Sequence, residues 1–195
     1  MESGRSSDRI AAIFLLLSLA ALTLAPLAMP SSYNWIDHTT SESAAQGVPN
    51  AWIARLGFAS WGMAALLLAA RKLRMGEKLG AAALTIFGVS MAGAASFSTK
   101  PWEGGSEYSA FADQAHTFFA STMGMAFLIA VISGPAVRRE RPHWTEAAAF
   151  LAALLMPTVM AVEPTVAGAA QRFMFLFAYI WFFHQSVAAT TTRRT

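Results

Sequence analysis

Six apolar runs of about 20 residues each constrain this chain more than any other feature, because a helix of about 20 apolar residues crosses the hydrocarbon core of a bilayer. Charged residues make up only 13% of the 195 positions, against about 25% in soluble domains, so the runs lack the charged face that a water-soluble bundle needs. The sequence therefore predicts an all-α, polytopic membrane bundle of six transmembrane helices that forms one domain over residues 1–195. The predicted spans are 10–29, 52–70, 79–97, 112–133, 144–162 and 169–188.

The positions of the basic residues predict how the bundle is oriented. All of the 14 Lys and Arg residues except Arg55, Lys100 and Arg172 lie in the two termini or in the loops at 71–78 and 138–141. Since basic loops tend to stay in the cytoplasm, we expect both termini there, in a multi-pass protein of the cytoplasmic (inner) membrane. The first run also has features of a cleaved secretory signal, but it is longer than the usual signal core of about 7–15 residues. We expect it to be retained as a span.

The composition excludes several kinds of chemistry. With no cysteine, the chain forms no disulfide, no iron–sulfur cluster and no covalent haem attachment. His116 and His184 are expected at opposite ends of the membrane and no span carries two stacked histidines, which disfavours a b-type haem. No Gly-rich phosphate loop is present, and orientation explains the basic loops, so we expect no nucleic-acid partner. The expected partner is the lipid bilayer, and the sequence identifies no protein partner.

Ionisable residues gather on the side that we expect to face outward, in the loops at 30–50 and 98–111 and at the nearby helix ends. Such groups at membrane depth are functional candidates by default, since burying them is costly. The candidate catalytic residues are His38, Glu42, Asp113 and His116.

Their spacing suggests how these four residues would meet. Asp113 and His116 are three residues apart on a predicted helix, so their side chains share a face. His38 and Glu42 share a face if residues 37–43 are helical. Histidines and carboxylates that converge in this way suit a divalent ion such as zinc with an open position, which lowers the pKa of a bound water to about 7. The predicted metal ligands are His38, Asp113 and His116, although no H-E-x-x-H spacing marks them.

Arg55, Gln171 and Arg172 are the candidate ligand-binding residues on the same side. Their donor groups suit an anionic headgroup, which guanidinium groups bind with charge-assisted hydrogen bonds. A structural role stays open beside this one, because Arg172 next to Glu163 or Asp113 would form a buried ion pair that holds helices in register. Proton-coupled transport is disfavoured, since no ionisable relay crosses the middle of the spans.

Short motifs on this side resemble those of a known family. They are the stretches 33–42 and 47–53, residues 56–58 with Gly62, His116 early in the fourth span, and residues 168–172 followed by Trp181. In these motifs the chain resembles the bacterial six-helix integral membrane family catalogued as domain of unknown function 998. The resemblance implies a single six-helix domain without an assigned activity, and the matching motif positions are His38, Ser41, Glu42, His116, Gln171 and Arg172. The chain is more distantly similar to the membrane hydrolases that include alkaline ceramidases, but it lacks their late paired histidines.

Two functions from different classes stay open. The first is an outward-facing polar pocket that binds a small molecule or a lipid headgroup, with metal-assisted hydrolysis as its catalytic form. The second is a non-enzymatic membrane scaffold or accessory subunit whose polar cluster fixes the packing of the helices. The sequence does not decide whether the protein is an enzyme.

Overall fold

Six long α-helices form the bundle in a computed structural model that describes residues 2–105 and 107–191. They are α1 (Glu2–Leu24), α2 (Trp52–Arg74), α3 (Lys78–Ser96), α4 (Ala110–Arg138), α5 (Trp144–Val162) and α6 (Ala167–Thr191). Three short 3-10 helices, η1 (Ala25–Ala28), η2 (Glu42–Ala44) and η3 (Pro164–Val166), lie in the connections, and the described ranges contain no strand. Each of the six long helices is apolar and long enough to cross a membrane. The predicted all-α, six-span architecture is therefore confirmed.

Several helices extend beyond the predicted spans, because a charged residue ends an apolar run without ending a helix. α1 begins at Glu2 rather than at residue 10, and α2 continues to Arg74 rather than to residue 70. Arg and Glu have high helix propensity, so the backbone stays helical past the apolar run. α1 ends at Leu24, close to Pro26, which lacks the backbone donor that a continuing helix would use.

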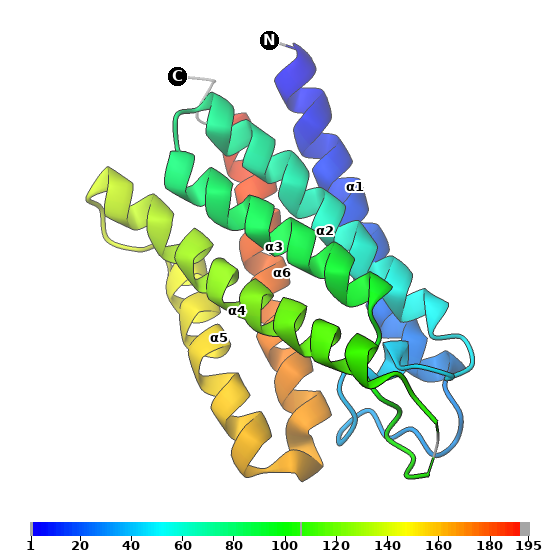
Figure 1. The fold of residues 1–195 in the computed structure, drawn as a ribbon. Coiled ribbons are helices and arrows are strands. Elements are labelled where there is room, and N and C mark those ends of the chain that lie inside the picture. Colours follow the sequence, from blue (N-terminus) through cyan, green and yellow to red (C-terminus); the bar gives the residue numbers. More distant parts are fainter. Residues whose placement is uncertain (1, 106, 192–195) are drawn as a thin grey trace.

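The helices run antiparallel to their neighbours in sequence, so both termini lie at one end of the bundle (Figure 1). We call this the terminal end, and the opposite end, which carries residues 29–51, 97–105, 107–109 and 163–166, the loop end. α1, α2, α3 and α4 pack side by side in sequence order, while α6 lies against both α1 and α5. α4 contacts α5 much less than it contacts α3. This difference leaves space between α4, α5 and α6.

Trp61 of α2 lies at the centre of the buried core, with only 1% of its surface exposed. Its indole stacks on the Tyr179 ring of α6 at a centroid distance of 4.0 Å. The rings of Phe87 and Phe175 approach it edge-on from α3 and α6, a geometry that aromatic pairs favour. Three helices are thus joined through one side chain.

α2 and α3 approach each other closely where Gly62 faces Gly88. A Cβ atom on either glycine would lie 2.8 Å from the carbonyl oxygen of the other, which is closer than van der Waals contact. Small residues allow helices in lipid to pack at such distances, where association depends on van der Waals contact. This pair therefore sets the separation of α2 and α3.

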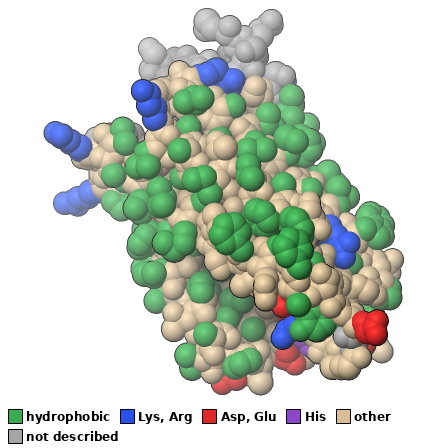
Figure 2. Space-filling view, viewed as in Figure 1, with side chains coloured by type: hydrophobic (Ala, Val, Ile, Leu, Met, Phe, Trp, Pro, Cys, Tyr) green, Lys and Arg blue, Asp and Glu red, His purple; other side chains and the backbone are tan. Residues whose placement is uncertain are grey.

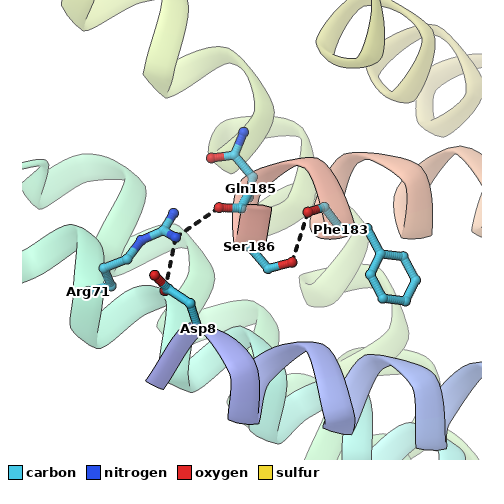
Figure 3. A network of polar contacts seen from close by, with 5 residues as sticks. All are labelled: Asp8, Arg71, Phe183, Gln185 and Ser186. Carbon is cyan, nitrogen blue, oxygen red and sulfur yellow. Dashed lines mark hydrogen bonds and ion pairs between the residues drawn. The ribbon is translucent and has the colours of Figure 1, made fainter. Parts of the chain in front are cut away.

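A buried arginine joins three helices at the terminal end (Figure 3). Arg71 of α2 donates through Nη1 to the carboxylate of Asp8 on α1 at 3.1 Å and to the carbonyl oxygen of Gln185 on α6 at 2.8 Å. Beside it, the Ser186 hydroxyl donates to the carbonyl oxygen of Phe183 at 2.8 Å. Because the Arg71 side chain is 10% exposed, its charge is compensated largely by Asp8 rather than by water.

Charged side chains differ between the two ends of the bundle. On the face shown in Figure 2, Asp and Glu side chains lie at the loop end, whereas most Lys and Arg side chains lie toward the terminal end. Large apolar side chains are exposed between the ends, among them Leu16, Phe118 and Leu151. A surface of this kind is suited to lipid, because a soluble monomer rarely exposes extensive apolar patches.

Candidate functional site

The loop before η2 docks onto the N-terminus of α6 through four consecutive carbonyl oxygens, those of residues 35–38. The first N–H groups of an α-helix have no partner within the helix, and here the loop supplies acceptors for two of them. Ala169 donates to the carbonyl oxygen of Ile36 at 2.9 Å, and Gly168 donates to that of Asp37 at 3.2 Å. The main-chain oxygen atoms of this loop therefore cap the N-terminus of α6.

Arg172 completes this docking from the next turn of α6. Its Nη1 donates to the carbonyl oxygens of Trp35 at 2.6 Å, His38 at 3.0 Å and Gly168 at 3.0 Å. Its Nη2 donates to the Tyr33 hydroxyl at 2.7 Å. The guanidinium is half-buried, so its positive charge is met by partial charges on oxygen atoms.

The prediction that Arg172 would form an ion pair with Glu163 or Asp113 is wrong. Within the described part of the chain, no carboxylate lies in ion-pair contact with Arg172. The Glu163 carboxylate instead accepts from the hydroxyl of Thr165 at 2.5 Å. The physical reason is that the docked loop offers carbonyl oxygens closer to the guanidinium than either acid.

Tyr33 links Arg172 to the next part of the loop. Its hydroxyl accepts from Arg172 and donates to the carbonyl oxygen of Thr39 at 2.9 Å. Burial raises the pKa of the Tyr33 phenol above its ordinary value of 10.0, and the nearby Arg172 guanidinium opposes this effect in part. The phenol is therefore a neutral donor at physiological pH.

His38, a predicted catalytic and metal-binding residue, is held within its own loop. Its Nδ1 accepts from the backbone N–H of Asn34 at 2.9 Å. Its ring packs against those of Tyr33 and Trp102, with all three ring centroids 5.3 Å from one another. Because Nδ1 accepts a hydrogen bond, the proton of the neutral ring is on Nε2.

Glu42 does not share a helix face with His38, because residues 37–43 do not form a continuous helix. Its carboxylate accepts from the backbone N–H of Thr39 at 2.6 Å and from the Thr39 hydroxyl at 2.8 Å. The Thr39 hydroxyl in turn accepts from the backbone N–H of Glu42 at 3.2 Å. This reciprocal pair is the arrangement of a capping box, and it fixes the entry into η2.

Gln171 and Arg55, two of the predicted ligand-binding residues, hold main-chain atoms of the same region. The Gln171 Oε1 accepts from the backbone N–H of Thr40 at 2.7 Å. Arg55 donates to the carbonyl oxygens of Ala44 and Ala45, each at 3.2 Å. Together they tie the loop to α6 on one side and to α2 on the other.

Asp113 and His116 lie on one face of α4, as their spacing predicts, and both reach the connection between α3 and α4. Asp113 accepts from the Thr99 hydroxyl at 2.9 Å and from the backbone N–H of Lys100 at 2.8 Å. His116 is 4% exposed, and its Nδ1 lies 2.8 Å from the carbonyl oxygen of Phe97. Since a carbonyl oxygen only accepts, Nδ1 carries the proton, and the buried Nε2 has no partner among the described residues.

The predicted metal ligands do not come together. Among residues 2–105 and 107–191, no group of three or more His, Asp or Glu side chains is placed to hold a metal ion. His38, Asp113 and His116 instead bind three different backbone groups, as described above. The structure therefore does not assemble the metal-ligand set that the sequence suggested.

A groove of about 400 Å³ runs between α1 and α6 and ends at Arg172. Among the residues that the structure describes, Arg172 is the one charged side chain that lines it. Its walls are mainly apolar, and they include Leu19, Leu22, Leu27, Phe175 and Leu176, with Trp35 and Thr40 near Arg172. The groove thus combines a cation at the loop end with an apolar channel along the bundle.

Sequence reasoning missed several residues that build this site. Tyr33 and Gly168 lie inside the quoted motifs, but nothing in their type indicates contact with Arg172 or with a carbonyl oxygen. Gln46 also joins the two large loops, since its side chain binds backbone atoms of Ser98 and Ser109. Side-chain contacts to the main chain leave little trace in a sequence, because every residue carries the partner group.

The helices and the docked loop define a six-span membrane protein whose last helix is capped at its N-terminus by an earlier loop. The family model described as "Protein of unknown function (DUF998)" matches residues 10–188, and the chain belongs to this family. The match confirms the family that the motifs suggested. No curated protein and no solved structure matches the chain.

Proposed function

We propose that this protein binds an anionic amphiphile of the bilayer in the groove between α1 and α6, with the charged headgroup at Arg172. The observation that carries the proposal is the half-buried Arg172 guanidinium, which lines the end of an apolar groove without a carboxylate partner in the described chain. A charge at membrane depth is costly unless it is paired. An anionic headgroup would provide that pairing.

The hydrogen-bonding capacity of Arg172 supports this proposal. A guanidinium has five N–H donors. Nη1 donates to carbonyl oxygens of the loop and of Gly168 in α6, and one proton of Nη2 is donated to Tyr33 of the loop. The Nε proton and the second Nη2 proton make no hydrogen bond to described residues, so two donors remain for phosphate or carboxylate oxygens.

The position of the groove also suits a lipid. Trp35 and Trp52, exposed at 53% and 63%, lie at the loop end, where tryptophan side chains commonly mark a membrane interface. Arg172 is therefore expected near the headgroup level, and the apolar walls extend from it toward the middle of the bilayer. An acyl chain would follow those walls.

We further propose that the terminal end faces the cytoplasm. Exposed basic side chains gather there, namely Arg74, Lys78, Arg139 and Arg141. Basic loops favour the cytoplasmic side. In this orientation the groove takes its ligand from the outer leaflet.

A scaffold role is the second candidate, and one observation favours it. The polar side chains of the loop end bind mostly main-chain atoms of their own chain, as Gln171 and Arg55 do. In that case Arg172 would only fix the docked loop. Hydrolysis is not proposed, because the candidate ligands His38, Asp113 and His116 each bind a separate backbone group.

Lipid binding by wild-type and variant protein separates the two candidates. We would measure by native mass spectrometry how much phosphatidylglycerol and phosphatidylcholine the purified protein retains. The wild type should prefer the anionic lipid, and Arg172→Gln should lose that preference. Arg55→Gln is the matched control, since Arg55 also binds loop carbonyls but does not line the groove.

Two further variants keep this test informative if Arg172→Gln folds poorly. Arg172→Lys retains the charge and should retain part of the preference. Leu176→Trp fills the groove without changing Arg172 and should reduce retention of both lipids. Equal lipid retention by all variants would reject the groove and favour the scaffold.

A further inference from the structure

A second cavity, of about 480 Å³, lies between α4, α5 and α6. Phe175 of α6 lines both this cavity and the groove, so the ring stands between the two spaces. On the side of the buried core, Trp61 and Phe87 also line this second cavity. The cavity exists because α4 contacts α5 only sparsely.

The lining of this cavity is neutral. No Asp, Glu, Lys, Arg or His side chain lines it among the residues that the structure describes. Four methionines contribute to its walls, Met123, Met125, Met160 and Met174. Methionine side chains are flexible and polarisable, and they adapt to apolar ligands of varied shape. A charged ligand group would be unpaired in such a space, which carries a large desolvation cost.

Two polar side chains line the cavity, those of Gln171 and Ser121, and the Gln171 amide has free donors and lies toward the loop end. Gln171 Oε1 accepts from the backbone N–H of Thr40, and this contact fixes which way the amide points. The NH₂ group of Gln171 makes no hydrogen bond to any described residue, while the side chain lines the cavity. It therefore offers two donors to a ligand in the cavity.

The lining of the cavity extends along α4 and α6. On α6 its lining runs from Gln171 to Ala178, which is about 10 Å at the helical rise of 1.5 Å per residue. On α4 it runs from Ala120 to Leu128. A chain lying in it would have its polar end at Gln171, near the loop end, and its tail toward the middle of the bundle.

We propose that this cavity binds an uncharged amphiphile whose polar end carries a carbonyl oxygen, which accepts from the Gln171 amide. The apolar tail lies among the methionine and aromatic side chains. Two membrane components have this chemistry, an acylglycerol and an isoprenoid quinone. This site is separate from the groove at Arg172, and it goes beyond the binding of an anionic lipid.

Filling the cavity tests the proposal. Gly124 lines the cavity, and a Cβ atom placed on it meets no heavy atom within 4 Å. Gly124→Leu therefore occupies the cavity without a clash at Cβ, and it also replaces a poor helix former with a good one. Ala136→Leu, on the exposed surface of the same helix, is the matched control.

The probes are 1-oleoylglycerol, decylubiquinone and oleate, added to the full-length protein in detergent. Native mass spectrometry follows all three, and quenching of the tryptophan fluorescence, to which Trp61 contributes, follows the quinone. At least one neutral probe should bind the wild type and Ala136→Leu equally, with about tenfold weaker binding to Gly124→Leu. Preference for 1-oleoylglycerol or for decylubiquinone identifies which class occupies the site.

Two further variants examine the polar contact. Gln171→Glu retains an acceptor for Thr40 but replaces the NH₂ donor, so it should weaken binding of the neutral probe about fivefold. Leu176→Trp, which fills the groove at a residue that does not line this cavity, should leave that binding unchanged, which separates this site from the groove. Wild-type protein that binds neither neutral probe, equal binding by Gly124→Leu, or tighter binding of oleate would overturn the proposal.

Discussion

Gly168 lies directly against the carbonyl oxygen of His38, in a place where no side chain fits. A Cβ atom on Gly168 would also lie 2.5 Å from the carbonyl oxygen of Trp35. The loop and the N-terminus of α6 can dock only because this helix position has no side chain. Two motifs that are far apart in sequence therefore meet in space.

Replacement of this glycine should undo the docking. We expect Gly168→Ala to lower the free energy of unfolding by about 2–3 kcal/mol, since overpacking a close backbone contact forces the loop to shift. Thermal unfolding in detergent measures the effect. Gly124→Ala is the control, because its Cβ would enter open space, and it should be neutral or stabilising by up to about 1 kcal/mol. Equal melting temperatures for Gly168→Ala and the wild type would contradict the docking.

The terminal end should depend on Arg71. Arg71→Met removes the partner of Asp8 and a donor to the carbonyl oxygen of Gln185, and we expect it to cost about 2 kcal/mol. Arg74→Met changes an exposed arginine of the same helix and should alter stability by less than about 0.5 kcal/mol. Chemical unfolding of both variants gives the comparison. A loss as large in Arg74→Met as in Arg71→Met would indicate a general effect of charge.

Tyr33 should make stability depend on pH in the alkaline range. Burial raises its pKa above 10.0 in the folded protein, so the folded state holds the phenol proton more tightly than the unfolded state does. The contribution is complete below about pH 10 and is lost as the pH rises through the higher folded value. The stability difference between the wild type and Tyr33→Phe, measured from about pH 8 to about pH 11, should therefore narrow above pH 10. A difference that stays constant or widens would contradict this reasoning.

A divalent metal should not contribute to the stability of the loop end. His38, Asp113 and His116 already bind separate backbone groups, so we expect a chelator to leave the melting temperature unchanged. Elemental mass spectrometry of the purified protein is the companion measurement. About one divalent ion per chain, lost in both His38→Ala and His116→Ala, would restore the metal hypothesis.

The fold was largely predictable from the sequence because membrane spans depend on the length and composition of apolar runs. The helix ends were less predictable. Arg74 and Arg138 lie beyond the apolar runs and yet within α2 and α4, since helix propensity and main-chain hydrogen bonding continue past the lipid-facing segment.

The sequence predicts on which side of the bundle the site lies, but it does not predict the contacts within the site. The sequence places His38, Gln171 and Arg172 on one side of the bundle, and the structure brings Arg172 to the carbonyl oxygen of His38. It does not bring Glu163 or Asp113 to Arg172, because main-chain oxygen atoms of the docked loop accept the hydrogen bonds of the guanidinium. Contacts of this kind depend on the path of the loop, which side-chain chemistry alone does not determine.

The most direct test of the central claim is a cryo-electron microscopy map of the wild-type protein in nanodiscs that contain phosphatidylglycerol and phosphatidylcholine. We expect lipid density in the groove between α1 and α6, with its phosphate within about 4 Å of the Arg172 guanidinium, and no such density in Arg172→Gln. An empty groove in the wild type, or the same density in both proteins, would contradict the assignment of Arg172 as a headgroup anchor.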